Sequence, residues 1–570
     1  MFVIFAQIDH KRIDPPCVTR LCGLYGYITC VEGRTVMHRV KHAAVSYAVV
    51  LIGTFVLFAP FAVQVLSWFE WSDGCEHAAA IKELSHSLQE PKNPHLDLPG
   101  TTSPRFVPSI ILMALLQRVS GMDIFTVLAC MSVVMFFVFG LGIYLFAKEY
   151  FQDATQPVYT LLCILFLWGK GWDGANGYMF SSLVFTAYYP SVVSFAGIFL
   201  ALTALLKYAR QNKPVFSLLY IVLSTLIVLN HPLTGFLFLL ISFLLVLTEK
   251  PAQKKNLFLF ALSCGMAIGV TVLWPYCSII ESIFFVTGNK VKEFWDYRAT
   301  HQFLYSELFI RIGPGLLGLI PILYFAKIRK YLFIVAGFFL CSIFYILGYF
   351  FDISLGERCI FFCMLFSQLA FSRFLKLLIH TECFLKSMRA QRLVTACFIV
   401  ALFLGTAAQL YLVGKVYLPQ RFEWKPALRI KPYQNPLQKY FSLPHYLHRD
   451  DIVLTDVFTS WLIPCIADAK VVSLLHNSPL VSDNAARLAD TMNFFAAPHA
   501  NQNIIKKYRT THILINKKKN PGAREEIEDS RFFIPYPDAH LMGQLAGFGR
   551  VVLDDENFFL VEVGSLSETS

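Results

Sequence analysis

The chain has 570 residues, of which 56% are hydrophobic and only 15% are charged. A soluble protein of this length needs far more polar surface than that, so the composition excludes an ordinary soluble domain. Apolar runs of about 20 residues recur along the chain, and this is the length that crosses the hydrocarbon core of a bilayer. They predict a polytopic α-helical membrane protein, because in lipid the backbone polar groups must be satisfied within each segment.

The net charge of +11 does not predict a nucleic-acid partner. The basic residues are spread over short loops between apolar runs, a distribution that usually records membrane topology. The 14 cysteines are scattered, mostly inside apolar segments, and no CxxC pair or Cys/His zinc spacing occurs. Because buried cysteine commonly behaves as a small hydrophobe, the sequence predicts no disulfide framework.

Residues 1–42 form the predicted cytoplasmic N-terminal segment. Met37 begins a basic stretch directly ahead of the first apolar run, as at a natural N-terminus. We therefore expect translation to start at Met37, and N-terminal mass spectrometry tests this. The first apolar run is too long for a cleavable signal peptide and ends without a small-residue cleavage site.

The transmembrane domain is predicted to cover residues 43–414 with about eleven spans. The third, fifth and sixth of these spans are short. By length and pattern, the spans comprise residues 43–67, 122–147, 156–168, 182–206, 215–230, 232–248, 257–276, 305–326, 331–350, 359–380 and 393–414.

Basic residues are frequent in alternate loops. Under the positive-inside rule the loops rich in Lys and Arg are cytoplasmic, so the N-terminus lies inside and everything after residue 414 lies outside. The loops expected inside hold Lys148; Lys207, Arg210 and Lys213; Lys250, Lys254 and Lys255; Lys327, Arg329 and Lys330; and Arg373, Lys376, Lys386, Arg389 and Arg392. The short loops expected outside hold fewer: Lys170, Lys290, Lys292, Arg298 and Arg358.

Two long regions are expected on the external side. The first external loop covers residues 68–121, and its apolar second half suggests a helix that lies in the membrane interface. The second region, residues 415–570, is predicted to form a small extracytoplasmic α/β domain. Its expected elements are strands at 451–458, 470–475 and 512–516, a hairpin around Asp554-Asp555, and a helix that Asp483 caps.

The stretch WSDGCEHAAAIKEL, residues 71–84, follows the first apolar run directly and places two acids, a thiol and an imidazole within five positions. Asp73 followed by Glu76 is a capping-box spacing, so a simple helix start is one interpretation. Asp73 and His77 share a helix face, which would suit two metal ligands. The third interpretation is a catalytic carboxylate that takes a proton at the membrane surface and is kept ionised by the helix dipole.

Three further polar positions lie at expected span mouths, where charge is costly and marks candidate sites. Arg105 follows a Pro-rich segment and could contact headgroups, a phosphate or Asp73. His231 lies in the turn NHPLTG and is either a turn residue or a phosphate donor. Glu357 and Arg358 precede the tenth span, either as a surface ion pair or, for Arg358, as a bidentate phosphate contact.

These pieces, in this order, resemble the integral-membrane glycosyltransferases of the GT-C class. That class includes the protein O-mannosyltransferases and the bacterial aminoarabinose transferases that modify lipid A. The features that match are the acid Asp73 soon after the first span, the long first loop with PKNPHL and SPRF, the many spans and the external tail. The segment DIVLTDVFTSWLIPCIADAKVV is similar to the tail domains of bacterial members.

The resemblance implies a GT-C-like fold, a polyprenyl-phosphate sugar donor, and a glycan, lipid or protein acceptor at the non-cytoplasmic face. It implies that Asp73 deprotonates or orients the acceptor and that Arg358 steadies the leaving phosphate, with His231 and Arg105 as looser matches. Many members have two adjacent acids, whereas Gly74 follows Asp73 here. Glu76 is the candidate for the second acid, and the location implied is a bacterial inner membrane.

We therefore expect Asp73 and Glu76 to be catalytic residues. The residues expected to bind substrate are His77, Arg105, His231, Glu357 and Arg358. No cofactor is required by this prediction, and a divalent cation stays an option. The alternatives are a lipid-linked glycan flippase or transporter, which should place polar groups near the membrane midplane, and a polymerase or ligase of lipid-linked glycans.

Overall fold

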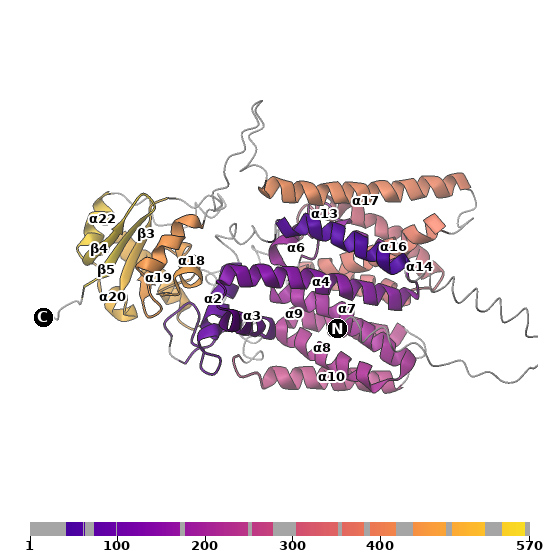
Figure 1. Ribbon diagram of the computed structural model, residues 1–570, viewed down its shortest axis with the longest axis horizontal. Helices are drawn as coiled ribbons and strands as arrows, with labels where there is room; N and C mark the ends of the chain where they lie inside the picture. Colours follow the sequence, from indigo (N-terminus) through magenta and orange to yellow (C-terminus); the bar gives the residue numbers. More distant parts are fainter. Residues whose placement is uncertain are drawn as a thin grey trace, which may run out of the picture.

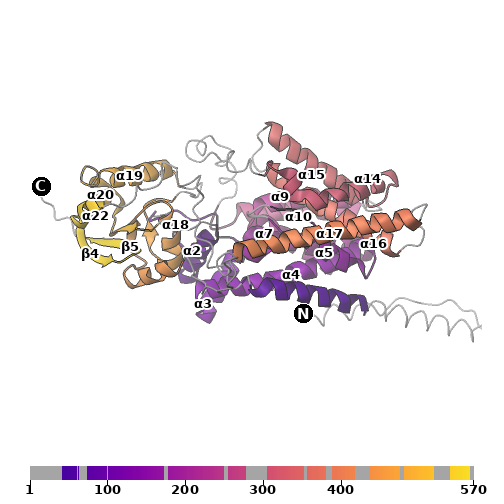
Figure 2. The same ribbon diagram turned by 90° about the horizontal axis from the view of Figure 1, so that it is seen from above.

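The structure is a computed structural model, which describes residues 42–60, 62, 73–98, 100–171, 177–248, 254–277, 304–351, 356–380, 388–417, 437–474, 481–518 and 539–564. Met37 and the segment before it lie outside the described residues. The molecule is elongated, with a bundle of long helices at one end and a sheet with its covering helices at the other (Figure 1). Two shorter helices, α2 (Asp73–His86) and α3 (Pro108–Ser120), lie between these parts in both views (Figures 1 and 2).

Within the described residues, eight helices are long and apolar enough to cross a membrane. They begin with His42–Pro60 and continue with α4 (Ile124–Phe151), α7 (Pro190–Gln211), α10 (Lys254–Val272), the composite Leu308–Lys327, α15 (Leu332–Phe351), Gly356–His380 and Met388–Gly414. The composite comprises α13 (Leu308–Ile312), the 3₁₀ helix η3 (Gly313–Gly318) and α14 (Leu319–Lys327). Gly356–His380 comprises η4 (Gly356–Arg358) and α16 (Cys359–His380), and the last span lies in α17 (Met388–Tyr417).

The three spans expected to be short are short helices. They are α5 (Gln156–Phe166), α8 (Pro214–Asn230) and α9 (Pro232–Thr248), each below the length of the eight. The helical membrane class is thus confirmed, and the total of eleven spans stays a prediction.

The fourth expected span, residues 182–206, is not one helix. A short helix α6 (Phe180–Thr186) ends before Tyr189, and α7 begins at Pro190. Tyr189 has an extended backbone, with φ −63° and ψ 142°. A residue that precedes proline disfavours helical dihedrals, and proline itself is favoured in the first turn of a helix. The break therefore follows from the sequence Tyr-Tyr-Pro, which the apolar pattern conceals.

In the part of the chain that the structure describes, five strands from residues 452–563 form one mixed sheet in the order β2-β1-β3-β5-β4. The strands are β1 (Ile452–Leu454), β2 (Lys470–Val471), β3 (His512–Asn516), β4 (Gly549–Asp554) and β5 (Phe558–Val563). Strand β1 runs parallel to β2 and β3, whereas β5 is antiparallel to both β3 and β4. The expected strands and the hairpin at Asp554-Asp555 are therefore present, although β1 and β2 are shorter than expected.

Among the described residues, the helical segments that accompany the sheet are η5 (Gln438–His445), α18 (Thr459–Ala467), α19 (Asn484–Ala496), α20 (Asn503–Tyr508) and α22 (Ala539–Ala546). Asp483 precedes α19 as expected, but its side chain makes no capping hydrogen bond. Both its oxygens instead accept from Nε of Arg487 at 3.0 Å, because the i,i+4 spacing brings the two side chains together.

The loop between α2 and α3 contacts the sheet as well as the bundle. Leu96 forms an isolated parallel bridge with Val471, and the N–H of Val471 donates to the carbonyl of His95 at 2.8 Å. The loop therefore extends the β2 edge. It covers main-chain groups that an edge strand would otherwise present to other chains.

Candidate functional site

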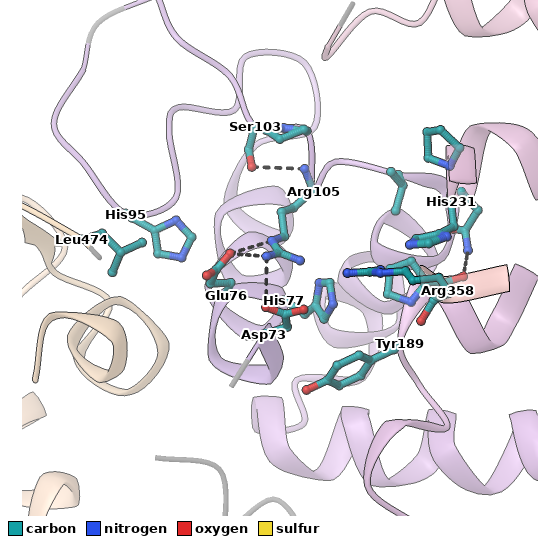
Figure 3. Close-up of a pocket in the computed structure, with 16 residues that line it drawn as sticks. Asp73, Glu76, His77, His95, Ser103, Arg105, Tyr189, His231, Arg358 and Leu474 are labelled. Atoms are coloured by element: carbon teal, nitrogen blue, oxygen red, sulfur yellow. Dashed lines mark hydrogen bonds and ion pairs between the residues drawn. The ribbon is translucent and has the colours of Figure 1, made fainter. Parts of the chain in front are cut away.

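A cavity of about 260 Å³ lies where α2, the loop before α3, and the bundle meet. Its walls come from five parts of the chain that are far apart in sequence. The lining residues are Asp73, Glu76, His77, His95, Ser103, Pro104, Arg105, Val107, Tyr189, Pro190, Ser191, Asn230, His231, Pro232, Arg358 and Leu474. Figure 3 shows Asp73, Glu76 and Arg105 together on one side of the cavity, and His231 and Arg358 on the other.

The carboxylates of Asp73 and Glu76 both face the guanidinium of Arg105. Residues three apart in a helix share a face, so the first turn of α2 places both acids on the same side. Nε of Arg105 donates to Oε2 of Glu76 at 2.7 Å, and its Nη2 contacts the same oxygen. The same Nη2 lies 3.4 Å from Oδ1 of Asp73. Burial alone would lower the pKa of Arg105, but Glu76 and Asp73 hold that pKa above its ordinary value, so the group stays charged.

Exposure separates the two acids. The side chain of Glu76 is 5% exposed and that of Asp73 is 38% exposed. Glu76 is therefore enclosed and bound to Arg105 by the shorter contacts. Asp73 keeps open surface on the cavity and a longer contact, so Asp73 is the acid that an incoming molecule can reach.

His77 is a neutral imidazole beside these acids. Burial and the nearby Arg105 lower its pKa to about 3, against the opposing effect of Asp73 and Glu76. Its ring meets the ring of Tyr189 edge to face, with centroids 5.0 Å apart. Nδ1 of His77 is buried and has no hydrogen-bond partner in the part of the chain that the structure describes.

The opposite wall is built by Asn230, which joins three elements at the end of α8. Its Nδ2 donates to the carbonyl of Pro190 at 2.7 Å, and its Oδ1 accepts from the N–H of Ser109 at 2.9 Å. One amide thus holds the start of α7 and the start of α3 at the end of α8. Such a buried side chain is costly unless all its groups are bonded, and here both ends are.

His231 follows Asn230 in the turn before α9, and its hydrogen bonds define its tautomer. Nδ1 accepts from the N–H of Thr234 at 3.3 Å and lies 2.8 Å from the hydroxyl of the same residue. A ring nitrogen that accepts carries no proton, so in the neutral ring the proton is on Nε2. Burial, with Arg358 and Arg105 nearby, lowers the pKa of His231 to about 3. His231 is therefore a neutral N–H donor at physiological pH.

Arg358 ends η4 and lines the cavity next to His231. Gly356 and Gly348 of α15 pack so closely that a Cβ on Gly356 would meet the Cα of Gly348 at 2.6 Å. This approach, which only glycine allows, sets where the segment with Arg358 begins. Glu357 is 4% exposed and is not among the residues that line the cavity, so its expected role in substrate binding stays a prediction.

The cavity thus brings together six of the seven residues that the sequence singled out, Glu357 being the exception. Sequence reasoning missed Tyr189, His95, Ser103 and Asn230 as lining residues. Tyr189 was hidden inside an expected span, although the following proline was a signal of a helix start. His95 lies in the Pro-rich segment PKNPHL. Its position at the cavity depends on the bridge between the next residue, Leu96, and Val471 of the sheet, which the sequence does not reveal.

The described side chains do not form a divalent-cation site. No group of three or more His, Cys, Asp or Glu among the described residues could hold a metal ion. Asp73 and Glu76 both point to a guanidinium, whose positive charge lies where a cation would have to bind.

In chemical terms the cavity offers one accessible carboxylate on one wall and a cation with an N–H donor on the other. A carboxylate can accept a proton, and a guanidinium with an imidazole N–H can stabilise negative charge on a phosphate oxygen. The rest of the lining combines the Glu76–Arg105 pair and other polar side chains with prolines, aliphatic residues and Tyr189.

No family model matches the chain, and no curated protein matches it significantly. Among solved structures, the chain is similar to the oligosaccharyltransferase of Archaeoglobus fulgidus in its apo form, with 14% identity, a TM-score of 0.48, and 82% of this chain and 69% of that one covered. The same protein tethered to an acceptor peptide containing the NVT sequon matches with 13% identity, a TM-score of 0.47 and the same coverage. These neighbours belong to the class that the sequence resembles. At this score and identity they assign no reaction to the chain, and the proposal that follows rests on the cavity.

Proposed function

We propose that the protein is a membrane glycosyltransferase that moves a sugar from a polyprenyl-phosphate-linked donor to an acceptor on the non-cytoplasmic face. One observation carries the proposal. A single cavity holds an accessible carboxylate, Asp73, opposite a cation and an N–H donor, Arg358 and His231. Departure of a phosphate from a sugar carbon with oxocarbenium character needs this pairing, with a base at the acceptor and positive charge at the leaving oxygen.

In the proposed reaction, the acceptor group gives its proton to Asp73 and attacks the anomeric carbon. The bond from that carbon to the phosphate oxygen breaks, and the electron pair leaves with the polyprenyl phosphate. Arg358 and Nε2–H of His231 bind the phosphate oxygens, which carry more negative charge as the bond breaks. Arg105 and Glu76 hold Asp73 in place rather than react, because their mutual contacts are short and enclosed.

The proposed sidedness is supported by the position of the charged residues along the helices. Helices α7 and α16 both begin at the cavity, at Pro190 and after Arg358. At the other end of the bundle, Arg210 near the end of α7 pairs with Glu149, and Arg373 and Lys376 near the end of α16 pair with Asp153. Basic residues favour the cytoplasmic side, so the cavity belongs to the opposite face.

The decisive experiment measures transfer by the purified full-length protein in liposomes. Radiolabelled polyprenyl-phosphate sugars are the donors, and membranes of the source organism supply the acceptors. We expect label to move into the acceptor fraction and Asp73→Asn to reduce the rate by about 10²- to 10⁴-fold, the usual contribution of a general base. The matched control, Asp450→Asn, removes an exposed acid on the same side of the protein and should keep the wild-type rate.

Two results would count against this proposal. Undiminished transfer by Asp73→Asn removes Asp73 as the base. Absence of turnover with every donor, while the labelled lipid crosses the bilayer in a protein-dependent way, replaces transfer with transport. Arg358→Ala adds a separate arm: weaker binding of the polyprenyl-phosphate donor is expected, and unchanged binding shows that the phosphate lies elsewhere.

A further inference from the structure

Cys75 and Cys465 meet in the interior of the protein although most of the chain separates them. Cys75 lies in the first turn of α2, between Asp73 and Glu76 of the cavity, and Cys465 lies in α18. Both cysteines are buried, at 4% and 1% exposure. Both are free thiols in the structure, and the side chain of Cys75 is a direct neighbour of that of Cys465, which is the first requirement of a disulfide.

The packing of α2 on α18 fixes this contact at two further points. Nζ of Lys82 donates to the carbonyl of Ile466 at 3.1 Å, and Nε2 of His86 lies 2.9 Å from Oδ2 of Asp468. Cys75, Lys82 and His86 are spaced by seven and four residues, so they share one face of α2. The thiols therefore meet through a matched interface of two helices rather than by chance approach of loops.

We propose that Cys75 and Cys465 form a disulfide in the mature protein, which covalently ties the helix of the candidate site to the sheet region. The oxidant is a disulfide-bonded protein of the non-cytoplasmic compartment. The thiolate of Cys465 attacks its disulfide and releases one oxidant thiolate; Cys75 then attacks the mixed disulfide and releases the second. Two thiols of this chain are oxidised, the oxidant's disulfide is reduced to a dithiol, and two protons are lost from Cys75 and Cys465.

The proposal uses the sidedness given above, because disulfides persist in oxidising compartments and are rare in the cytoplasm. It does not depend on which reaction the cavity performs. Because both sulfurs are buried in the folded protein, the exchange takes place before α2 and α18 close on each other. The bond would then hold the residue next to Asp73 and Glu76 to a fixed point of the C-terminal region.

The test uses the full-length protein in its membrane, quenched in acid at harvest. Thiols are first blocked in denaturant with N-ethylmaleimide, then disulfides are reduced, and the newly exposed thiols are labelled with deuterated N-ethylmaleimide. Mass spectrometry of the peptides should find the deuterated label on Cys75 and Cys465. Cys163 and Cys363 are buried cysteines within helices, and they should carry the first label, which separates disulfide bonding from mere burial.

The first label on Cys75 and Cys465 would overturn the proposal, whether or not the protein transfers sugar. A Cys75→Ser variant identifies the partner. In that variant Cys465 should change from the deuterated to the first label, and a deuterated label retained on Cys465 would mean that Cys75 is not its partner. The wild-type measurement stands alone if the variant does not fold.

Discussion

Arg105 decides which of the two acids in the cavity is available for chemistry. Its guanidinium makes short contacts with Glu76, which is 5% exposed, and a 3.4 Å contact with Asp73, which is 38% exposed. The sequence shows the two acids and their spacing, but Arg105 lies 29 residues after Glu76. The choice between the acids therefore depends on a tertiary contact, and residue spacing alone cannot make it.

Glu76→Gln should lower the stability of the protein, whereas Asp73→Asn should change it little. Removing the charge of Glu76 leaves a buried guanidinium with its weaker partner, and breaking a buried pair typically costs about 3–5 kcal/mol. Thermal and denaturant unfolding in detergent measures both variants, with Glu556→Gln as control because Glu556 is 77% exposed. Equal loss of stability in Glu76→Gln and Asp73→Asn would contradict the assigned roles.

His77 should make stability depend on pH in the acid range. Its pKa is about 3 in the folded protein, below the ordinary value of 6.5, so between these values the unfolded chain binds the extra proton. The contribution of the neutral ring is complete above pH 6.5 and falls as pH drops towards 3, by about 2 kcal/mol at pH 5. His77→Asn should flatten the unfolding curve against pH, while the exposed-site variant His445→Asn should keep it. An unchanged curve in His77→Asn would show that the ring is not buried as a neutral group.

At the scale of elements, α2 is held to the sheet region by Glu83. This buried carboxylate accepts from Lys470 at 2.9 Å, from Arg449 at 3.0 Å and from the N–H of Lys92 at 3.0 Å. Lys470 also donates to the carbonyl of Asn93 at 2.7 Å. The helix with Asp73, the loop with His95 and strand β2 are therefore joined through one carboxylate.

Lys470→Met should destabilise the sheet region and the cavity together. Glu83 is 2% exposed and would lose its most enclosed partner, at a cost of about 3–5 kcal/mol. Lys507→Met is the control, since Lys507 is 51% exposed and surface ion pairs contribute about 0–1 kcal/mol. Limited proteolysis and unfolding measure both variants. If Lys470→Met behaves like Lys507→Met, the Glu83 cluster does not hold these elements together.

Elements with a strong local signal were predictable, and those set by a single residue were not. The hairpin around Asp554-Asp555 and the helix after Asp483 follow from turn residues and helical spacing. The break at Tyr189 was not foreseen, because a proline within an apolar run leaves the hydropathy pattern unchanged. Nor could spacing reveal the bridge from Leu96 to Val471, since pairing between segments so distant depends on the complete fold.

At the scale of the whole molecule, the six lining residues that the sequence singled out come together because several chain crossings end at one face. Charge and span length predict that face. Consecutive spans cross the membrane in alternate directions, so the polar residues at their ends lie either on one side or on the other. The exact walls of the cavity depend on packing between helices, such as the Asn230 contacts to Pro190 and Ser109. Those contacts depend on one side-chain amide. A single residue does not change the hydrophobic periodicity, so the sequence pattern does not reveal them.

The two faces can be tested with single cysteines at the exposed Glu556 and the partly exposed Lys213. Glu556 lies between β4 and β5 of the sheet, and Lys213 directly precedes α8 of the helix bundle, and these two parts are at opposite ends of the molecule (Figure 1). A membrane-impermeant maleimide added to cells with a permeabilised outer layer should label Glu556→Cys, and should label Lys213→Cys only after lysis. The wild-type chain gives the background, and the reverse pattern would place the cavity on the cytoplasmic side.

The bridge between Leu96 and Val471 has a consequence for how the protein is made. Strand β2 is synthesised long after the first loop, so on a ribosome the loop that carries His95 and Arg105 must wait for a partner that has not yet left the tunnel. Domains generally fold as they emerge, but here one wall of the cavity is completed by Leu474, which is synthesised long after Arg105. A nascent molecule would therefore enter the membrane with an incomplete cavity until the segment with β2 has been synthesised.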